Sequence, residues 1–203
     1  MRRFAIIGHR AMAKGKLPLN DLAGSAGRMD VLVRALMSAF LTSHGIREDV
    51  EMVIHLYGGP GPKRRIKFVG SELKGFHAQE RAVAGIIAKV ISLPNSPRGI
   101  WKEIIPGVYD SGGDIKHTLA EWDQSLKIIL DANEESLWNE QSKLDNSNKE
   151  EPDICFILSD DKTLEEIDAE GILYRSLGDS WLQGNAAITI VHFLMDQRVP
   201  LNL

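Results

Sequence analysis

Backbone amides exposed at a glycine turn are the first chemically informative feature of this sequence. The turn is centred on Gly178, between a short apolar strand expected at 172–174 and an apolar helix expected at 188–195. A strand, a glycine turn and a helix form the arrangement in which α/β proteins offer main-chain N–H groups to a ligand. Dinucleotide-binding and P-loop proteins place that turn after their first strand, so its position near the end of this chain is unusual.

A second candidate is the pair Arg28 and Asp30 in the segment GSAGRMD. An arginine at the entrance to a helix has the wrong sign for the helix dipole, which indicates a functional reason for its presence. Asp30 has two explanations, a functional carboxylate or an ordinary acid in the first turn of the helix.

Paired carboxylates at Asp160 and Asp161 follow the apolar run ICFILS. They could bind a metal or a hydroxyl-bearing ligand, or they could be helix N-terminal acids that complement the dipole. We expect no metal site, because the six histidines show no paired ligand spacing and the single cysteine, Cys155, is expected in a buried strand. The sequence also lacks the P-loop, dinucleotide, nucleophile-elbow and zinc-protease motifs.

Charge is distributed unevenly along the 203 residues. Residues 1–100 hold 16 Lys/Arg and 7 Asp/Glu, a net charge of +9, whereas residues 101–203 hold 8 and 21, a net charge of −13. Such asymmetry predicts a polyanionic partner for the first half. The densest basic cluster, Lys63, Arg64, Arg65 and Lys67, indicates either nucleic-acid contact or a solvated edge strand that uses cations to resist aggregation.

Short strand-like runs alternate with helical patterns, which predicts a single α/β domain over 1–203 with a mostly parallel sheet. No apolar run approaches the roughly 18–20 residues needed to cross a bilayer, and the N-terminus does not read as a signal peptide. With its lone cysteine the chain suits a reducing, cytoplasmic setting. We expect strands at 2–8, 51–58, 65–70, 106–110, 126–130, 154–160 and 172–174, helices at 29–44, 79–91, 115–123, 163–170 and 188–195, and an exposed loop at 141–153.

Several segments taken together resemble a known family. The segments GSAGRMDVLVRALMSAFLTSHGIREDV, LYGGPGPKRRIKFVGSELKG, HAQERAVAGII, PGVYD and SLGDSWLQGNAAITIVHFLMDQ are similar, in this order, to the archaeal tRNA pseudouridine N1-methyltransferases and their bacterial relatives. These are members of the SPOUT superfamily of knotted methyltransferases. The resemblance covers nearly the whole chain.

This resemblance implies a SPOUT-type α/β fold, a mostly parallel sheet flanked by helices with a C-terminal trefoil knot, and a homodimer. It implies S-adenosylmethionine as the cofactor, bound by the half 101–203, while the basic half 1–100 would engage RNA. Three loops would hold the cofactor largely through main-chain groups. The corresponding residues are Leu130, Leu158, Ser159, Leu177, Gly178, Asp179, Ser180, Trp181, Leu182 and Ala187.

For the acceptor, the resemblance implies N1 of a pseudouridine in the T-loop of tRNA, an imide N–H that loses its proton as the methyl group arrives. Asp30 is the candidate carboxylate beside that base, and Arg28 could hold a phosphate or stabilise developing oxyanion charge. Phosphate contacts would come from Arg10, Lys14, Lys63, Arg64 and Arg65.

Two alternatives to this acceptor remain open. Family members typically read SLGP…LHASHCI where this chain reads SLGDSWLQGNAAI, so Ala186 and Ala187 stand in place of a histidine and a cysteine. The protein could methylate another RNA position, or it could bind RNA or the cofactor without turnover.

Overall fold

The computed structural model describes residues 1–138, 152–167 and 169–203. Its central element is one eight-stranded sheet in the order β4-β5-β3-β2-β1-β7-β6-β8. The polar loop predicted at 141–153 falls, except for its last two residues, outside the described residues. The strands are β1 (Arg2–Gly8), β2 (Val50–Leu56), β3 (Arg64–Val69), β4 (Lys102–Ile105), β5 (Val108–Gly112), β6 (Leu126–Leu130), β7 (Ile154–Ser159) and β8 (Ile172–Arg175).

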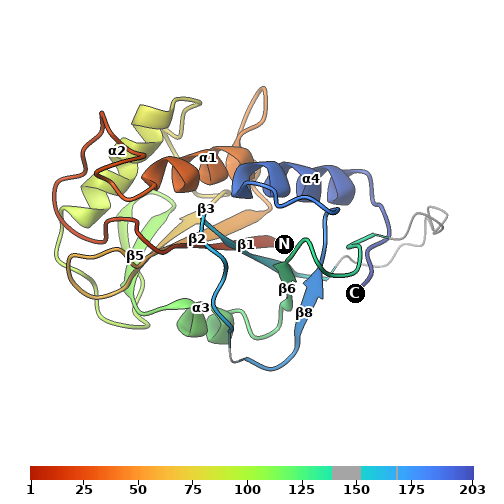
Figure 1. Ribbon diagram of the computed structural model, residues 1–203. Coiled ribbons are helices and arrows are strands. Elements are labelled where there is room, and N and C mark those ends of the chain that lie inside the picture. The colour runs from red at the N-terminus through yellow and green to blue at the C-terminus, as the bar shows by residue number, and fades with distance from the viewer. Residues whose placement is uncertain (139–151, 168) are drawn as a thin grey trace.

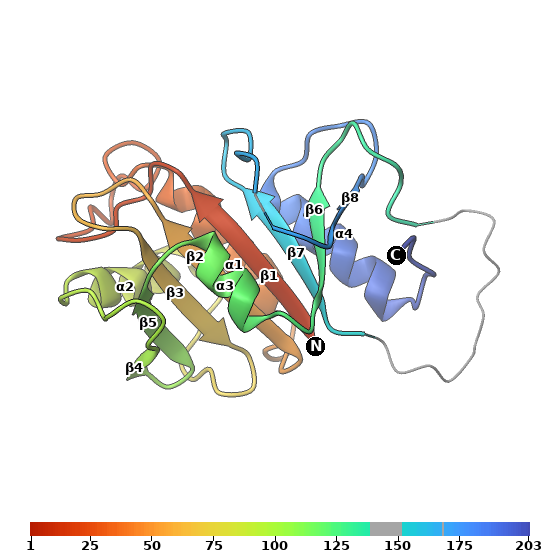
Figure 2. The same ribbon diagram turned by 90° about the horizontal axis from the view of Figure 1, so that it is seen from below.

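Five neighbouring strands are parallel, as predicted. β1 lies in the middle and pairs in parallel with β2 on one side and β7 on the other, and β6 pairs in parallel with both β7 and β8. Figure 2 shows β1, in red, running beside β7. The pairs β2–β3, β3–β5 and β4–β5 are antiparallel. The carboxyl ends of the parallel strands therefore meet at one edge, the usual place for a ligand in such sheets.

Helices cover both faces of the sheet (Figure 1). The helices α1 (Met29–Phe40), α2 (Glu80–Ile91) and α4 (Gly184–Asp196) lie on one face, and α3 (Ile115–Glu121) lies on the other. Along β1, Phe4 and Ile6 belong to the core beneath α1 and α4, whereas Ala5 and Ile7 belong to the core beneath α3. A strand covered on both faces must be apolar throughout, which explains its continuous hydrophobic run. Within the described residues, no helix has both the length and the apolar character that crossing a bilayer demands.

One predicted helix is wrong and one strand was missed. The described residues of 163–170 form no helix, although Thr163 and Glu166 have the spacing of a capping box. Asp160, just before the segment, is bonded to His9 after β1, and Ile167 is buried in the core beneath α3, so tertiary contacts fix the chain at both points. Strand β4 was missed because it is a short edge strand whose first two residues are exposed, and it shows little alternation of apolar residues.

The predicted phosphate contacts of Arg64 and Arg65 are contradicted by the burial of both side chains in the sheet. They lie on β3, an interior strand between β2 and β5, and both side chains are fully buried. Arg64 donates from Nε to Asp110 (2.6 Å), and Arg65 donates from Nη2 to Glu121 (2.9 Å). The edge-strand interpretation is wrong for the same reason. A buried guanidinium needs several acceptors, which here are carbonyl and carboxylate oxygens of the protein itself.

Much of the charge asymmetry is satisfied within the fold. Seven arginines of the basic first half form ion pairs with carboxylates of the acidic second half, so the polarity stabilises the contact between the two halves of the chain. These pairs are Arg2–Asp196, Arg47–Asp196, Arg3–Asp153, Arg10–Asp161, Arg28–Asp161, Arg64–Asp110 and Arg65–Glu121.

The buried Arg64–Asp110 pair predicts a large stability defect in Asp110→Ala. The substitution leaves a fully buried guanidinium without its carboxylate, which costs about 3–5 kcal/mol. Replacing the exposed Glu170 by alanine should change the free energy of unfolding by less than about 0.5 kcal/mol. Urea denaturation measures both, and equal stabilities of the two variants would contradict the assignment.

Candidate functional site

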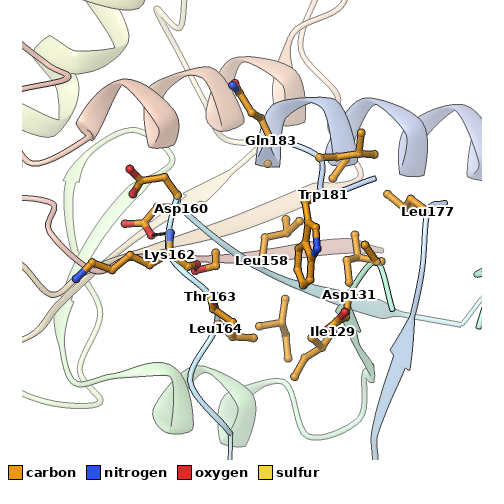
Figure 3. Close-up of a pocket in the computed structure, with 18 of the residues that line it drawn as sticks. Ile129, Asp131, Leu158, Asp160, Lys162, Thr163, Leu164, Leu177, Trp181 and Gln183 are labelled. Carbon is orange, nitrogen blue, oxygen red and sulfur yellow. Dashed lines mark hydrogen bonds between the residues drawn. The ribbon is translucent and has the colours of Figure 1, made fainter. Parts of the chain in front are cut away.

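A pocket of about 790 Å³ opens at the carboxyl edge of β6, β7 and β8, where α4 begins. Three stretches of chain supply most of its lining, at 129–132, 157–166 and 177–187 (Figure 3). These are the three loops to which the cofactor was assigned from the resemblance. Eight of the ten predicted cofactor residues line the pocket, namely Leu130, Leu158, Ser159, Leu177, Ser180, Trp181, Leu182 and Ala187.

Gly178 and Asp179 are the two that do not line it. Gly178 has a φ of 123°, a conformation that favours glycine, and its N–H donates to Ser176 Oγ (2.8 Å). The glycine turn therefore shapes the loop, and the residues on either side of it, Leu177 and Ser180, reach the pocket.

The pocket combines apolar walls with an acidic rim. Ile129, Leu158 and Leu164 contribute aliphatic surface, and the indole of Trp181, 63% exposed, stands at the same cavity (Figure 3). Asp131, Asp161, Glu165 and Glu166 form the rim, and Asp160, whose carboxylate is buried, also belongs to the lining. Such a site suits a flat apolar ring system that carries hydroxyl groups and positive charge. The sequence analysis did not assign Thr163–Glu166 to this lining, because a helix was expected at 163–170.

Asp160 is fixed by hydrogen bonds from neighbouring residues. It is not a helix N-terminal acid, because the described residues of 163–170 form no helix. Its side chain is fully buried and lies next to the end of β1. It accepts from the N–H of His9 (2.7 Å), pairs with His9 Nδ1 (2.9 Å) and accepts from the N–H of Lys162 (3.0 Å). The dashed contact between Asp160 and Lys162 is visible in Figure 3.

Asp161 connects the pocket to the predicted catalytic pair. It accepts hydrogen bonds from Arg10 and from Arg28 Nη1 (2.7 Å). Arg28 also forms a two-point contact with Asp30 (3.0 and 3.3 Å), and Arg34 donates to the same carboxylate (2.6 Å). The result is an alternating ion-pair chain, Arg10–Asp161–Arg28–Asp30–Arg34, at one end of the pocket.

The arginines hold both carboxylates in their ionised form. The hydrogen bond from Arg10, reinforced by the charges of Arg10 and Arg28, lowers the pKa of Asp161 below its usual value. Burial by itself would raise the pKa of Asp30, but Arg28 and Arg34 outweigh burial and lower it. A carboxylate stabilised in this way is a weak proton acceptor.

Arg28 is placed in an unusual backbone conformation. It is the N-cap of α1 with a φ of 64°, in the left-handed region, which costs a non-glycine residue about 1 kcal/mol. The preceding Gly27 also has a positive φ, and a Cβ there would come within 1.8 Å of the Arg10 carbonyl oxygen. This close approach brings the backbones at residues 10 and 27–28 together, so that both arginines reach Asp161.

The remaining predicted RNA contacts differ in exposure. Lys14 and Lys63 are exposed, and Lys63 Nζ lies 4.2 Å from the centre of the Tyr57 ring. The Arg10 side chain is 47% exposed despite its pair with Asp161. These three cations remain available to a polyanion, unlike Arg64 and Arg65.

Comparison with known proteins decides the family. The family model described as "Putative SAM-dependent RNA methyltransferase" matches residues 1–199. The chain belongs to this family. Among named relatives of the methyltransferase, the tRNA (pseudouridine(54)-N(1))-methyltransferase of Methanococcus aeolicus is 36% identical, covering 97% of this chain and 98% of its own. The protein of that name from Methanosarcina acetivorans is 34% identical, covering 97% and 92%.

The fold also has a solved counterpart. The methyltransferase superposes with a TM-score of 0.57 on Archaeoglobus fulgidus Nep1 bound to S-adenosylhomocysteine, covering 96% of each chain at 11% identity. At that identity the likeness concerns the fold, an α/β sheet flanked by helices, as the resemblance to SPOUT proteins implied.

Ala187 offers a direct test of the pocket of this methyltransferase. Its side chain is 4% exposed and lines the cavity, so Ala187→Leu should fill part of the space and weaken binding of S-adenosylhomocysteine at least tenfold. The neighbouring Ala186 does not line the cavity, and Ala186→Leu should leave affinity within about threefold. Calorimetric titration, with melting temperatures as a check on folding, compares the two, and equal affinities would argue against the pocket.

Proposed function

We propose that this protein transfers a methyl group from S-adenosylmethionine to N1 of a pseudouridine in the T-loop of tRNA, the position 54 named for its relatives. The proposal rests on Asp161, which lines the three-loop pocket and also accepts a hydrogen bond from Arg28 of the ion-pair chain. A nucleoside-sized cavity alone would suit many ligands. Here Arg28, whose donors suit phosphate or carbonyl oxygens, stands at its end.

The residues of the pocket would fit the cofactor as follows. Leu130, Leu158 and Leu177 would pack against the adenine ring, while loop main-chain groups bond its edge. The acidic rim, including Asp131, suits ribose hydroxyls and the positive charge of the sulfonium. When bound, the cofactor supplies an activated methyl group, and the protein contributes the orientation of the acceptor against it.

Arg28 and Asp30 would act as a unit at the acceptor. Removal of the N1 proton leaves negative charge on the flanking carbonyl oxygens, and a guanidinium donor there stabilises that charge. Asp30 grips Arg28 at two points and is itself held by Arg34, so it fixes the direction of the guanidinium. This geometry favours Asp30 as a positioning group for Arg28 over Asp30 as a base.

For the RNA backbone, we assign phosphate contacts to Arg10, Lys14 and Lys63. Within the described residues, Lys14 and Lys63 form no ion pair, so neither must break one to reach a phosphate, and Lys63 would exchange only its contact with the Tyr57 ring. Arg10 lies between this basic surface and the pocket.

A homodimer is part of the proposal. Most apolar residues of α4 pack into the core, but Phe193 is 61% exposed. It borders a shallow hollow of about 520 Å³ between α1 and α4, together with Met37 and Leu41. An exposed phenylalanine beside an apolar hollow suits a second copy of this chain.

The proposal includes a C-terminal knot and a cytoplasmic setting. Residues after α4 return to the segment that follows β6, where Leu201 bridges Trp138 and the N–H of Asn202 donates to Leu137 (2.8 Å). This return is the contact expected if the C-terminal segment passes through a loop of the chain. An enzyme acting on tRNA would work in the cytoplasm.

Methyl transfer is tested with a T-loop stem-loop RNA that carries pseudouridine at one position. The protein should form N1-methylpseudouridine, detected by nucleoside mass spectrometry, and the same RNA with uridine should give no product. Arg28→Ala should lower kcat/KM by about 100-fold or more, because one charge-stabilising donor is lost.

A matched arginine serves as the control. Arg81→Ala removes an exposed side chain on α2 and should keep near-wild-type activity. Methylation of the uridine RNA, or full activity of the Arg28 variant, would contradict the proposed acceptor and the proposed role.

Phe193 tests the dimer. Phe193→Asp places a charge in the proposed interface, so sedimentation velocity at micromolar concentration should show a monomer where the wild-type protein is a dimer. Leu93→Asp changes another exposed apolar residue, after α2, and should leave the dimer intact. A wild-type monomer would remove this part of the proposal.

A further inference from the structure

His9 is placed against the pocket wall and takes no part in the ion-pair chain. Its Nδ1 lies 2.9 Å from Asp160 Oδ1 and 3.5 Å from Ser159 Oγ, and both of these residues line the pocket. The next residue, Arg10, contacts Asp161, which also holds Arg28. His9 therefore lies at the corner where the cofactor pocket meets the arginines assigned to the acceptor.

The hydrogen bonds around Asp160 fix the tautomer of His9. Ser159 Oγ donates its hydrogen to the carbonyl of Lys162 (2.6 Å), so it does not supply a proton to the imidazole. The buried carboxylate of Asp160 accepts bonds from two backbone N–H groups and from Nδ1–H. With the proton on Nδ1, the lone pair is on Nε2. Within residues 1–138, 152–167 and 169–203, Nε2 makes no hydrogen bond.

The groups of the ion-pair chain are poorly suited to accept a proton. Asp30 and Asp161 are each bonded to two arginines, and both have a lowered pKa. Arg10 and Arg28 are cations, and so is Lys162 on the loop that carries Asp160. His9, whose Nε2 faces away from its bond to Asp160, is better placed than these groups to accept a proton.

We propose that His9 is the base that removes the N1 proton of the acceptor, with Asp160 as its positioning residue. The N1–H bond breaks, its proton passes to His9 Nε2, directly or through one water, and its electron pair forms the new bond from N1 to the methyl carbon. The bond from that carbon to sulfur breaks and its electrons stay on sulfur, which neutralises the sulfonium. The imidazolium is stabilised by Asp160 and later gives its proton to solvent. This inference rests on the proposed function.

His9 has an arrangement that recurs in catalytic histidines. A carboxylate behind Nδ1 sets the ring orientation and stabilises the imidazolium, which leaves Nε2 to act on the substrate. The side chain of His9 is 12% exposed, so the ring is largely fixed while one edge remains accessible. Arg10 and Arg28 lie close enough to the same corner to stabilise the anion that proton removal creates.

The test compares His9→Gln, His9→Ala and the exposed-site control His77→Gln on the pseudouridine RNA. Both His9 variants should bind S-adenosylhomocysteine within about threefold of wild type, and kcat should fall about 10²–10⁴-fold. The rise of kcat/KM with pH that a histidine base produces should be absent from both variants. Added imidazole should restore activity to His9→Ala and not to His9→Gln, whose side chain occupies the space. The His77 variant should match wild type.

Three results would overturn the inference. Activity of His9→Gln above about one third of wild type would show that no base is needed at this position. If the His9 variants lose cofactor affinity together with activity, His9 is structural. The same conclusion follows if they lose activity, imidazole does not rescue His9→Ala, and the pH profile is unchanged. Failure of the wild-type protein to methylate the RNA would instead refute the proposed function. The assay separates the two cases, because wild-type activity is measured beside that of the variants.

Discussion

The parallel pairing of β1 with β7 is the constraint on which the site depends. Its register places Ile7 opposite Ser159, so the residues that follow each strand meet although about 150 positions separate them in the chain. His9 then meets Asp160, and Arg10 meets Asp161. Without this pairing the acidic loop would be an isolated cluster of carboxylates. With it, the basic first half and the pocket of the second half share one corner.

The arginines of this chain fall into two groups, one buried in the sheet and one at the pocket. Arg64 and Arg65 are buried in the sheet, where several acceptors satisfy each guanidinium. Arg10 and Arg28 remain partly exposed and contact Asp161 on the pocket loop. The strained backbone of Arg28 fits this second role, because left-handed geometry at a non-glycine residue persists where the surrounding structure fixes it.

The sequence predicted the strands of the sheet well, because buried parallel strands read as continuous apolar runs. It also predicted which loops form the pocket, through the family resemblance. It failed at Arg64 and Arg65, since burial of an arginine depends on acceptors such as Asp110 that lie far along the chain. It failed at 163–170, where tertiary contacts of Asp160 and Ile167 outweighed a valid capping pattern. The position of His9 beside the pocket was not predicted for the same reason, because its carboxylate partner is 151 residues away.

The central claim is that the pocket and the arginine-lined corner together methylate pseudouridine in tRNA. Its most direct measurement is nucleoside mass spectrometry of purified tRNA from cells with and without the gene for this protein. We expect N1-methylpseudouridine to disappear from the tRNA of the deletion strain and pseudouridine to rise by the same amount. An unchanged level of N1-methylpseudouridine, or the loss of a different methylated nucleoside, would contradict it.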